Sequence, residues 1–540
     1  MTRILLILAL SALVLTACAA PAPGGEQSGP PPATTQPQYG GTFYLTTVTG
    51  PQTVHPHNDN GIGNNITMRP VYENLLKYDY STDFRDEYKL LPWLAERWER
   101  TDPLSYVFHI RRGVKFHDGN EFSAADVVWS LDYLRDPANK FRRAVVLREA
   151  DKIEAVDPYT VRITSRSPLA GFISNFTGDT MILSRQAFES GRNMDKETVG
   201  TGPFKLTSWD ARGGATMVKN ESYWMQGRPY LDKLQLFYNF EASAAIAAFA
   251  AQKNDVVKVT DKAQFETVKA TNPNAWGEPF AQNISDHLIM KIDRPPFNDI
   301  RVRRALHLAL DRQEMLNTLS FGEGTMNPPG MNGARKDWSI TQEELARLPG
   351  YRQPKEQDMA EAKRLLAEAG HGNGLKVTFM YNQGYTRYPG EAQVVAGQLT
   401  KAGIQVTLEP RETAVAQKAE ADGDFIMTFA QFRYEADGPD WPFWLHSKQA
   451  KARVGIDDRD LDRLIDDQYK ELDEEKRKKM WTDLQRLLLD KLYVVPLTTQ
   501  VGYIAYQPYA HGWGDNRAGQ AVNQAWENTW VEKERLPAGR

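Results

Sequence analysis

The chain of 540 residues contains a single cysteine, Cys18. One thiol can form neither an intramolecular disulfide nor a paired-cysteine metal site. The cysteine must therefore be idle, catalytic or modified. With 41% hydrophobic residues, the chain has the composition of an ordinary globular protein, and each of its domains can bury a proper core. At a soft average of about 150 residues per domain, the length predicts two to four domains.

The charges of the chain nearly balance. It has 65 Lys and Arg residues against 69 Asp and Glu residues, a formal charge of −4 and a pI near 6.2. This composition is typical of a soluble globular protein and excludes disorder for most of the chain. Because it gives no broad positive field, we expect no nucleic-acid partner.

Cys18 ends an N-terminal segment that is typical of a secretory signal. Arg3 is followed by the apolar run 4–15, which is too short to span a bilayer. Residues 15–18, Leu-Thr-Ala-Cys, resemble the bacterial lipobox, which implies cleavage before Cys18 and a lipid on its sulfur. We therefore expect residues 1–17 to be a lipoprotein signal peptide. Alternatively, the segment is an ordinary secretory signal peptide that is cleaved at another position, and Cys18 is not the first residue of the mature protein.

Residues 18–38 follow as a predicted flexible tether. They are dense in Pro, Gly, Ser, Thr and Gln, and Glu26 is their only charged residue, so they have too little apolar surface to order themselves. No later apolar run approaches 18 residues, so no other membrane span is expected. We expect the folded part to begin at Tyr39 and to lie outside the cytoplasm, anchored to a membrane by lipid.

Beyond the tether, strand-like and helix-like segments alternate, which favours an α/β architecture. The predicted strands are residues 41–46, 106–110, 161–164, 204–206, 216–218, 234–237, 255–259, 376–381, 404–408 and 425–429. Ser123, Asp299 and Asp358 are predicted to cap helices. Further helices are expected at residues 242–252, 391–402 and 460–492, the last one strongly charged. Residues 376–408 form a strand–helix–strand unit whose two strands should be parallel.

Several motifs together resemble one family, the extracytoplasmic solute-binding proteins of peptide-type ABC transporters. This family also includes binders of nickel chelates, opines and oligosaccharides. The motifs are residues 91–99, 106–119, 122–128, 200–204 and 296–312. Because they occur in the family's order and spacing, the resemblance covers essentially Tyr39 to the C-terminus.

The resemblance implies an α/β fold of the periplasmic-binding-protein type II. Two lobes would be joined by crossing strands, with an extra subdomain inserted in the first lobe. The first lobe would comprise residues 39–71, 200–285 and 502–540, the insert residues 72–199, and the second lobe residues 286–501. A small-molecule or peptide ligand would bind between the lobes, and their closure would present a new surface to an ABC permease and ATPase complex. We expect a monomer without cofactors.

The resemblance also indicates where a ligand binds. In peptide-binding members, a stretch similar to residues 436–440 supplies an aspartate that pairs with the α-ammonium of the ligand, and Asp437 is the matching position. The stretch follows the predicted strand 425–429, and α/β proteins bind ligands at such strand ends. The neighbouring candidates are Arg433, Tyr434, Glu435 and Trp441. In the alternative, Asp437 only caps the following turn.

Thr201, Gly202 and His57 complete the expected site. A tight turn that needs unusual backbone angles explains the glycines of residues 200–203 better than ligand contact does. His57 and His55 stand where the family has an Asp-Pro-His sequence, and two imidazoles this close could share a metal. No cysteine or convincing carboxylate accompanies them, so we predict no metal site.

The sequence leaves the ligand class open. Asp437 favours a peptide. Arg433 and Glu435 stand where peptide binders often have small or neutral residues, which favours an oligosaccharide or another organic solute. Aromatic residues suited to stacking on a sugar or filling a side-chain pocket are Tyr434, Trp441, Phe443 and Trp444.

The competing functional class is a secreted hydrolase. The sequence has no Gly-x-Ser-x-Gly motif and no His-Glu-x-x-His motif, and its lone cysteine lies in the leader. We therefore predict a binding protein and not an enzyme. A third possibility is that a protein of the same fold acts as a sensor or as a chaperone partner without transport.

Overall fold

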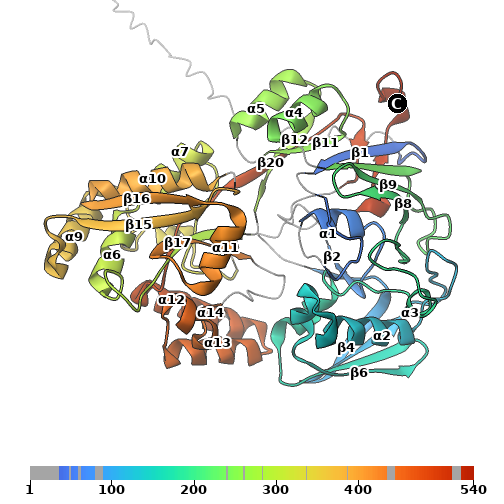
Figure 1. Cartoon of the computed structure of the whole chain (residues 1–540), viewed down its shortest axis with the longest axis horizontal. Coiled ribbons are helices and arrows are strands. Elements are labelled where there is room, and N and C mark those ends of the chain that lie inside the picture. The colour runs from blue at the N-terminus through green and yellow to red at the C-terminus, as the bar shows by residue number, and fades with distance from the viewer. Residues whose placement is uncertain are drawn as a thin grey trace, which may run out of the picture.

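The computed structural model describes residues 36–47, 50–58, 62–79, 89–238, 241–259, 262–282, 284–335, 337–385, 387–433, 444–513 and 525–540. Strands and helices alternate through this part of the chain, which confirms the predicted α/β class (Figure 1). The predicted signal peptide, Cys18 and nearly all of the tether lie outside the described residues. Within those residues, we find no helix that combines the length and the apolar character needed to cross a membrane.

The first lobe, as we use the term, is the part built around a seven-stranded sheet of order β12-β20-β11-β1-β10-β9-β8. Its strands are β1 (Thr42–Thr47), β8 (Phe204–Asp210), β9 (Gly214–Lys219), β10 (Lys233–Tyr238), β11 (Val256–Val259), β12 (Trp276–Ala281) and β20 (Val501–Tyr506). Helices α4 (Ala242–Ala250) and α5 (Lys262–Thr271) lie above this sheet (Figure 1). Phe265 of α5 packs there against Val257 and Tyr503.

A second sheet, which is antiparallel throughout, is formed by residues between β1 and β8 in the sequence. Its strands, in the order β4-β5-β7-β6, are β4 (Ala95–Asp102), β5 (Ser105–Ile110), β6 (Ala150–Asp157) and β7 (Thr160–Ser165). Helix α2 (Ala124–Arg135) packs on this sheet and is capped as predicted, because the Ser123 backbone N–H donates to the Asp126 carboxylate at 3.0 Å. Shorter elements nearby are α1 (Ile62–Met68), β2 (Leu76–Tyr78), β3 (Leu90–Pro92) and α3 (Arg185–Glu189).

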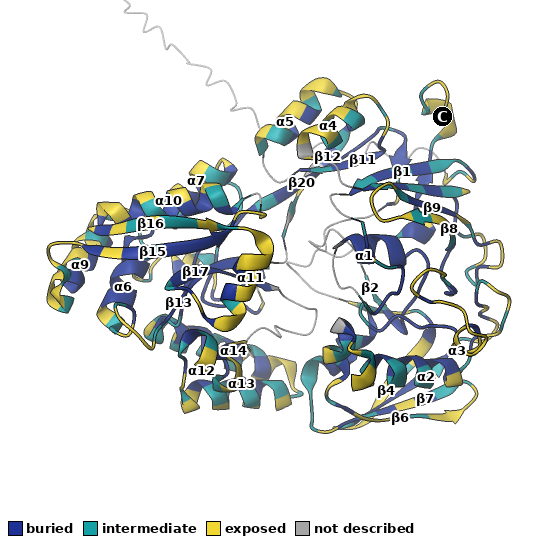
Figure 2. Ribbon diagram, viewed as in Figure 1, coloured by how far each residue is buried: buried dark blue, intermediate teal, exposed yellow. Residues whose placement is uncertain are grey.

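The second lobe is built around a five-stranded sheet of order β16-β15-β17-β13-β18. Its strands are β13 (Ile284–Met290), β15 (Leu375–Asn382), β16 (Ile404–Arg411), β17 (Met427–Arg433) and β18 (Val494–Pro496). The predicted strand–helix–strand unit is confirmed, because β15 and β16 pair in parallel, with Leu375 opposite Ile404. Strands β13 and β15 are largely buried (Figure 2).

Helices surround this second sheet (Figure 1). They are α6 (Ile300–Ala309), α7 (Arg312–Ser320), α8 (Gln342–Leu345), α9 (Glu356–Leu366), α10 (Tyr388–Lys401), α11 (Thr413–Asp422), α12 (Ser447–Val454), α13 (Arg459–Lys470) and α14 (Glu474–Lys491). The remaining short strands are β14 (Thr325–Met326), β19 (Thr498–Thr499), β21 (Ala510–His511) and β22 (Trp530–Val531).

The chain passes between the two large sheets twice. β12 ends at Ala281 in the seven-stranded sheet, and β13 begins at Ile284 in the five-stranded sheet. In the return direction, β18 ends at Pro496 and β20 begins at Val501. Two sheets joined by two short connections agree with the predicted fold of two lobes and crossing strands.

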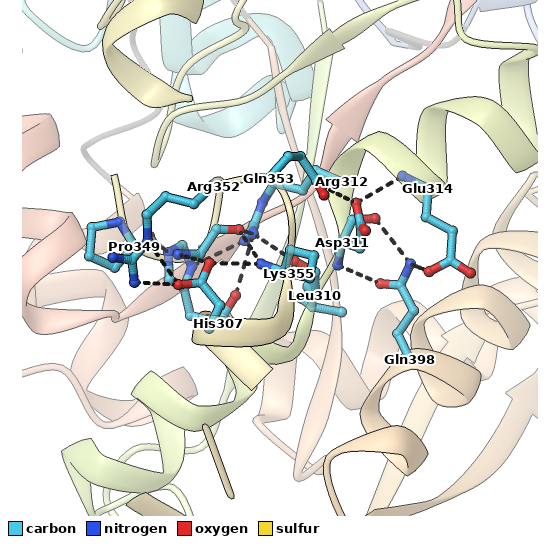
Figure 3. A network of polar contacts seen from close by, with 12 residues as sticks. His307, Leu310, Asp311, Arg312, Glu314, Pro349, Arg352, Gln353, Lys355 and Gln398 are labelled. Carbon is cyan, nitrogen blue, oxygen red and sulfur yellow. Dashed lines mark hydrogen bonds and ion pairs between the residues drawn. The ribbon is translucent and has the colours of Figure 1, made fainter. Parts of the chain in front are cut away.

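Arg312 holds the end of β18, just before the second connection, to the helices of the second lobe. Figure 3 shows Arg312 beside His307 and Pro349. The fully buried guanidinium of Arg312 donates from Nε to the Pro496 carbonyl at 2.9 Å and from a terminal nitrogen to Nδ1 of His307 at 3.0 Å. His307 must therefore be neutral at Nδ1, and its Nε2 donates to the Pro349 carbonyl at 3.1 Å. Burial is the main reason that the pKa of His307 lies well below its usual value. Arg312, the last residue of the last sequence motif, thus has a structural role.

One long charged helix at residues 460–492 was a wrong prediction. The structure has two helices, α13 and α14, separated by residues 471–473. The Asp473 carboxylate accepts a hydrogen bond from the Lys476 backbone N–H and caps α14. The helical spacing of charges continues through this break, so periodicity alone did not reveal it.

A further local prediction is wrong. Asp358 does not cap α9, which begins two residues earlier; its buried carboxylate instead accepts from the Gly350 backbone N–H and from Lys355. The carboxylate forms these bonds because the loop 349–355 packs against the first turn of α9, a contact that a local sequence window does not contain.

Candidate functional site

The carboxyl ends of strands from both large sheets meet at the crossing connections. In the seven-stranded sheet β1, β10 and β11 are parallel, and β12 runs in the same direction because both β11 and β12 are antiparallel to β20. In the five-stranded sheet, Arg433 at the end of β17 pairs with Ile284, the first residue of β13. Ligands of α/β proteins bind at such carboxyl ends. This junction is therefore the candidate site.

A buried ion pair lies on the second-lobe side of the junction. Arg387, just before α10, donates to the Asp286 carboxylate at 2.7 Å, and Asp286 is 1% exposed. Arg387 also donates to Oε1 of Gln282 at 3.3 Å, so it reaches the connection between the lobes. Gln431, near the end of β17, donates to the same carboxylate at 3.4 Å. The guanidinium thus ties the connection, β13 and α10 together.

Glu391 is a second acidic residue close to the ion pair of Arg387 and Asp286. It lies in the first turn of α10 with no exposed surface, and neither of its carboxyl oxygens has a hydrogen-bond partner. Burial, reinforced by the charge of Asp286, raises the pKa of Glu391 well above its usual value. Burial also raises the pKa of Asp286, although Arg387 opposes that shift. The cluster is electrically neutral when Glu391 keeps its proton.

Four of the eight residues expected to bind the ligand follow the end of β17 in the sequence. Asp437, Tyr434, Glu435 and Trp441 are outside the described residues. For Arg433 the structure gives the backbone pairing with Ile284, which places the start of this segment beside the crossing connection. Trp444, which follows the segment, has 53% of its surface exposed.

Thr201 is fully buried and Gly202 is buried where their turn packs against residues 70–73. The Thr201 hydroxyl donates to the Glu73 carboxylate at 2.8 Å. Gly202 is needed for close packing and not for unusual backbone angles, because a Cβ there would lie 2.4 Å from the Pro70 carbonyl oxygen. The Glu73 carboxylate also accepts from Trp93, Tyr223 and Trp224. Burial raises the pKa of Glu73 to about 7, although these donors lower it.

His57 is also fully buried, with Nε2 at 2.9 Å from the Met181 carbonyl oxygen. Its backbone N–H donates to Nδ1 of His55 at 3.1 Å, and both rings pack against Phe141. Burial lowers the pKa of His57 to about 3, so the ring is neutral at ordinary pH. The described residues contain no group of three or more His, Cys, Asp or Glu side chains that could hold a metal ion.

Sequence reasoning missed Asp286, Arg387 and Glu391. Arg387 follows the predicted strand 376–381 and precedes the predicted helix 391–402, a position that could have marked it as a candidate. Asp286 and Glu391 gave no comparable signal, because their proximity depends on how β13 packs beside α10.

The model of the bacterial extracellular solute-binding proteins, family 5, matches residues 89–453. The chain belongs to this family. The family 5 protein described here is 26% identical to heme-binding protein A of Haemophilus influenzae, over 94% of this chain and 96% of the relative. It is 28% identical to the glutathione-binding protein GsiB of Salmonella choleraesuis, over 69% of each.

Solved structures of similar fold agree with this assignment. The periplasmic binding protein DppA from Helicobacter pylori, in complex with the peptide STSA, is 25% identical, with a TM-score of 0.74 over 92% of this chain and 99% of DppA. The substrate-binding protein CtaP of Listeria monocytogenes has a TM-score of 0.78 over 92% of this chain and all of CtaP, at 19% identity. The predicted family and the periplasmic-binding-protein fold are thus confirmed, and the family 5 protein is an extracytoplasmic binding protein.

Proposed function

We propose that this family 5 protein is the solute-binding component of an ABC importer, which captures a peptide between its lobes and delivers it to a membrane permease. The observation that supports this most directly is the junction at which the carboxyl ends of both sheets meet beside two crossing connections. The relationship to heme-, glutathione- and peptide-binding proteins supports the same conclusion.

Binding at this junction couples the ligand to the angle between the lobes. Among the described strands, the chain passes from one large sheet to the other only after β12 and after β18, so small backbone changes at these two passages reorient one lobe against the other. A solute that contacts both sheet edges binds the closed arrangement more tightly and shifts the equilibrium toward it. We propose residues 286–501 as one moving unit and the remaining folded chain as the other.

A peptide is the preferred ligand because of the segment that leaves β17. Asp437 lies four residues after Arg433, whose pairing with Ile284 places the end of β17 at the junction. A carboxylate at a closing interface favours a cationic group, and every peptide with a free N-terminus has one. The similar fold of DppA in complex with a peptide is consistent with this choice.

Attachment to the membrane through Cys18 completes the proposal. Residues 18–38 would then form the tether between the lipid and the folded part, and the protein would act as a monomer beside its permease. Intact mass measurement of the mature protein tests this directly. An N-terminal diacylglyceryl cysteine is expected, and an unmodified N-terminus would contradict the anchor.

Native mass spectrometry of protein purified without refolding tests the ligand class. We expect bound peptides, and we expect a peptide panel to raise the melting temperature by mass action while a saccharide panel does not. Stabilisation by saccharides alone would replace the peptide with an oligosaccharide. If purified protein converts a panel member into a new compound, the binding-only function is wrong.

A further inference from the structure

A cavity of about 880 Å³ lies in the second lobe, between α6, α9 and α14. Figure 1 shows α6 and α9 on the side of this lobe that faces away from the first lobe, so the cavity is separate from the junction. Its volume is within the range of about 300–1,000 Å³ that is usual for sites of organic ligands. Four arginines line it from four separate elements, namely Arg304 of α6, Arg352 of the loop before α9, Arg364 of α9 and Arg486 of α14.

The charges of the lining favour an anion. The acidic residues of the lining are Glu344, Glu361 and Asp490. Four guanidiniums against three carboxylates leave an excess of one positive charge. The Arg364 guanidinium is the main reason that the pKa of Glu361 lies below its usual value, and the charges of Arg304 and Arg352 lower it further. Three of the four arginines therefore act on one point of the α9 wall.

Two of the arginines keep N–H donors for a ligand. Arg304 donates from one terminal nitrogen to the Asp490 carbonyl at 3.4 Å, and its ion pair with the Asp490 carboxylate is loose, at 3.6 Å. Arg486 donates from one terminal nitrogen to Glu344 at 3.2 Å and lies 3.8 Å from Asp483. A guanidinium has five N–H donors, so these bonds to described residues leave donors unused. About half of each arginine side chain is exposed, so a solute can reach both.

Arg304 and Arg486 also lie beside the same residue. Arg486 and Asp490 are one turn apart on α14 and therefore share a face of that helix. Because Arg304 contacts Asp490, the two guanidiniums open on the same part of the cavity. The side chains of Leu348 and Leu489 line the cavity as well, and both are half-buried in a small apolar cluster. The cavity thus offers an apolar surface together with a pair of guanidiniums.

Another part of the lining is held in place by a network of hydrogen bonds. His307 donates from Nε2 to the Pro349 carbonyl at 3.1 Å, and Arg352 donates from Nε to the fully buried Asp358 carboxylate at 3.0 Å. Figure 3 shows His307, Pro349 and Arg352 in this network. Side chains that are fixed before a ligand arrives lower the entropic cost of binding.

We propose that this cavity binds a small phosphate monoester, whose phosphate accepts hydrogen bonds from Arg304 and Arg486 and whose apolar group packs against Leu348 and Leu489. A phosphate monoester has three acceptor oxygens, so it can bond both guanidiniums at once. The two oxygens of a carboxylate fill the fork of one guanidinium. This second site lies outside the junction and does not depend on the proposed function.

Three probes test the ligand class, namely phenyl phosphate, benzoate and inorganic phosphate. They are titrated by calorimetry against the wild-type protein at pH 8, where a phosphate monoester is doubly charged. We expect phenyl phosphate to bind at least tenfold more tightly than the other two, because benzoate lacks the third oxygen and inorganic phosphate lacks the ring. Equal affinity for benzoate would overturn the preference for a phosphate. Equal affinity for inorganic phosphate would overturn the apolar contact, and absence of phenyl phosphate binding would overturn the whole inference.

Charge-removing variants locate the bound phosphate. Arg304→Gln and Arg486→Gln should each weaken phenyl phosphate binding at least tenfold. Arg463→Gln is the matched control, because Arg463 of α13 is also exposed and pairs with Asp460 at 3.2 Å. It should leave the affinity unchanged. Unchanged affinity in folded Arg304→Gln and Arg486→Gln would contradict the site.

A cavity-filling variant tests the site without changing its charge. Ala360 of α9 is exposed and lines the cavity, so Ala360→Trp should place a ring there and abolish phenyl phosphate binding. Ala452→Trp, at an exposed alanine of α12, is the control and should bind as the wild type does. Phenyl phosphate should also bind equally with and without a bound peptide. If Ala360→Trp keeps the wild-type affinity, or if a peptide displaces phenyl phosphate, the phosphate lies elsewhere and the inference is wrong.

Discussion

Lys262 of α5 and Glu323 between α7 and β14 form an ion pair that joins the first lobe to the second. The Tyr503 hydroxyl donates to the same carboxylate, so two groups of the first lobe hold one acid of the second. About a third of each charged side chain is exposed. An ion pair of this exposure contributes up to about 1 kcal/mol and weakens with salt.

Glu323→Gln should shift the angle between the lobes away from the arrangement that contains this contact. A change of up to about fivefold in the populations corresponds to 1 kcal/mol. Spin labels on cysteines placed at Lys253 and Lys363, both exposed, would report the distance between the lobes. Glu266→Gln, an exposed acid on α5 outside the pair, is the control. Identical distance distributions for Glu323→Gln and wild type, at low and high salt, would contradict the prediction.

Arg387→Met should strongly destabilise the second lobe. It leaves the Asp286 carboxylate buried without its cation, a change that typically lowers the free energy of unfolding by about 3–5 kcal/mol. Adding Asp286→Asn removes the buried unpaired carboxylate and should restore part of the lost unfolding free energy. Urea unfolding of the wild type and of the single and double variants measures this. If the double variant is less stable than the single one, the charge explanation is wrong.

Thr201→Val should reduce stability by about 1–3 kcal/mol, because the buried Glu73 carboxylate loses a hydrogen-bond donor. Ligand affinity should stay unchanged if the hydroxyl serves only Glu73. Thr207→Val removes a threonine hydroxyl from the exposed part of β8 and provides the comparison. A tenfold loss of affinity at unchanged stability would instead support the predicted ligand contact of Thr201.

Glu73 should also make stability depend on pH. Its pKa is raised to about 7 in the folded state, so the folded protein holds this proton more tightly than the unfolded chain. That contribution is fully present below about pH 4.5, and it is lost as the pH rises through 7. Glu73→Gln cannot ionise, so its unfolding free energy should fall less than that of the wild type between pH 5 and pH 8. Equal slopes in urea titrations would refute this account.

Asp437→Asn should weaken binding of a peptide with a free N-terminus by tenfold or more, because the amide cannot balance the ammonium charge. N-acetylated forms of the same peptide should show no further loss with the variant. Calorimetry gives both affinities, and Asp440→Asn serves as the neighbouring control. If Asp437 only caps a turn, the variant will lose stability and keep its affinity.

Local sequence patterns predicted many of the elements correctly. The capping pair Ser123 and Asp126, the helix that begins after Asp299, and the parallel strands β15 and β16 depend on contacts within a few residues or on one repeated periodicity. The break before Asp473 was missed because the charge pattern does not change there. The family motifs fixed the fold, and the buried contacts of Thr201 and Arg312 explain why such motifs need not line a pocket.

The sequence by itself determined the α/β class and the family, and it predicts a ligand segment after the strand that ends in Arg433. Only the tertiary structure brought Asp286, Arg387 and Glu391 into one buried cluster, and gathered four arginines from separate elements around one cavity. Hydrophobic periodicity depends on residues that are close in the sequence, so it can be recognised without the tertiary structure. The electrostatics of a site depend on distances and burial between residues far apart in the chain, which exist only after the sheets have packed.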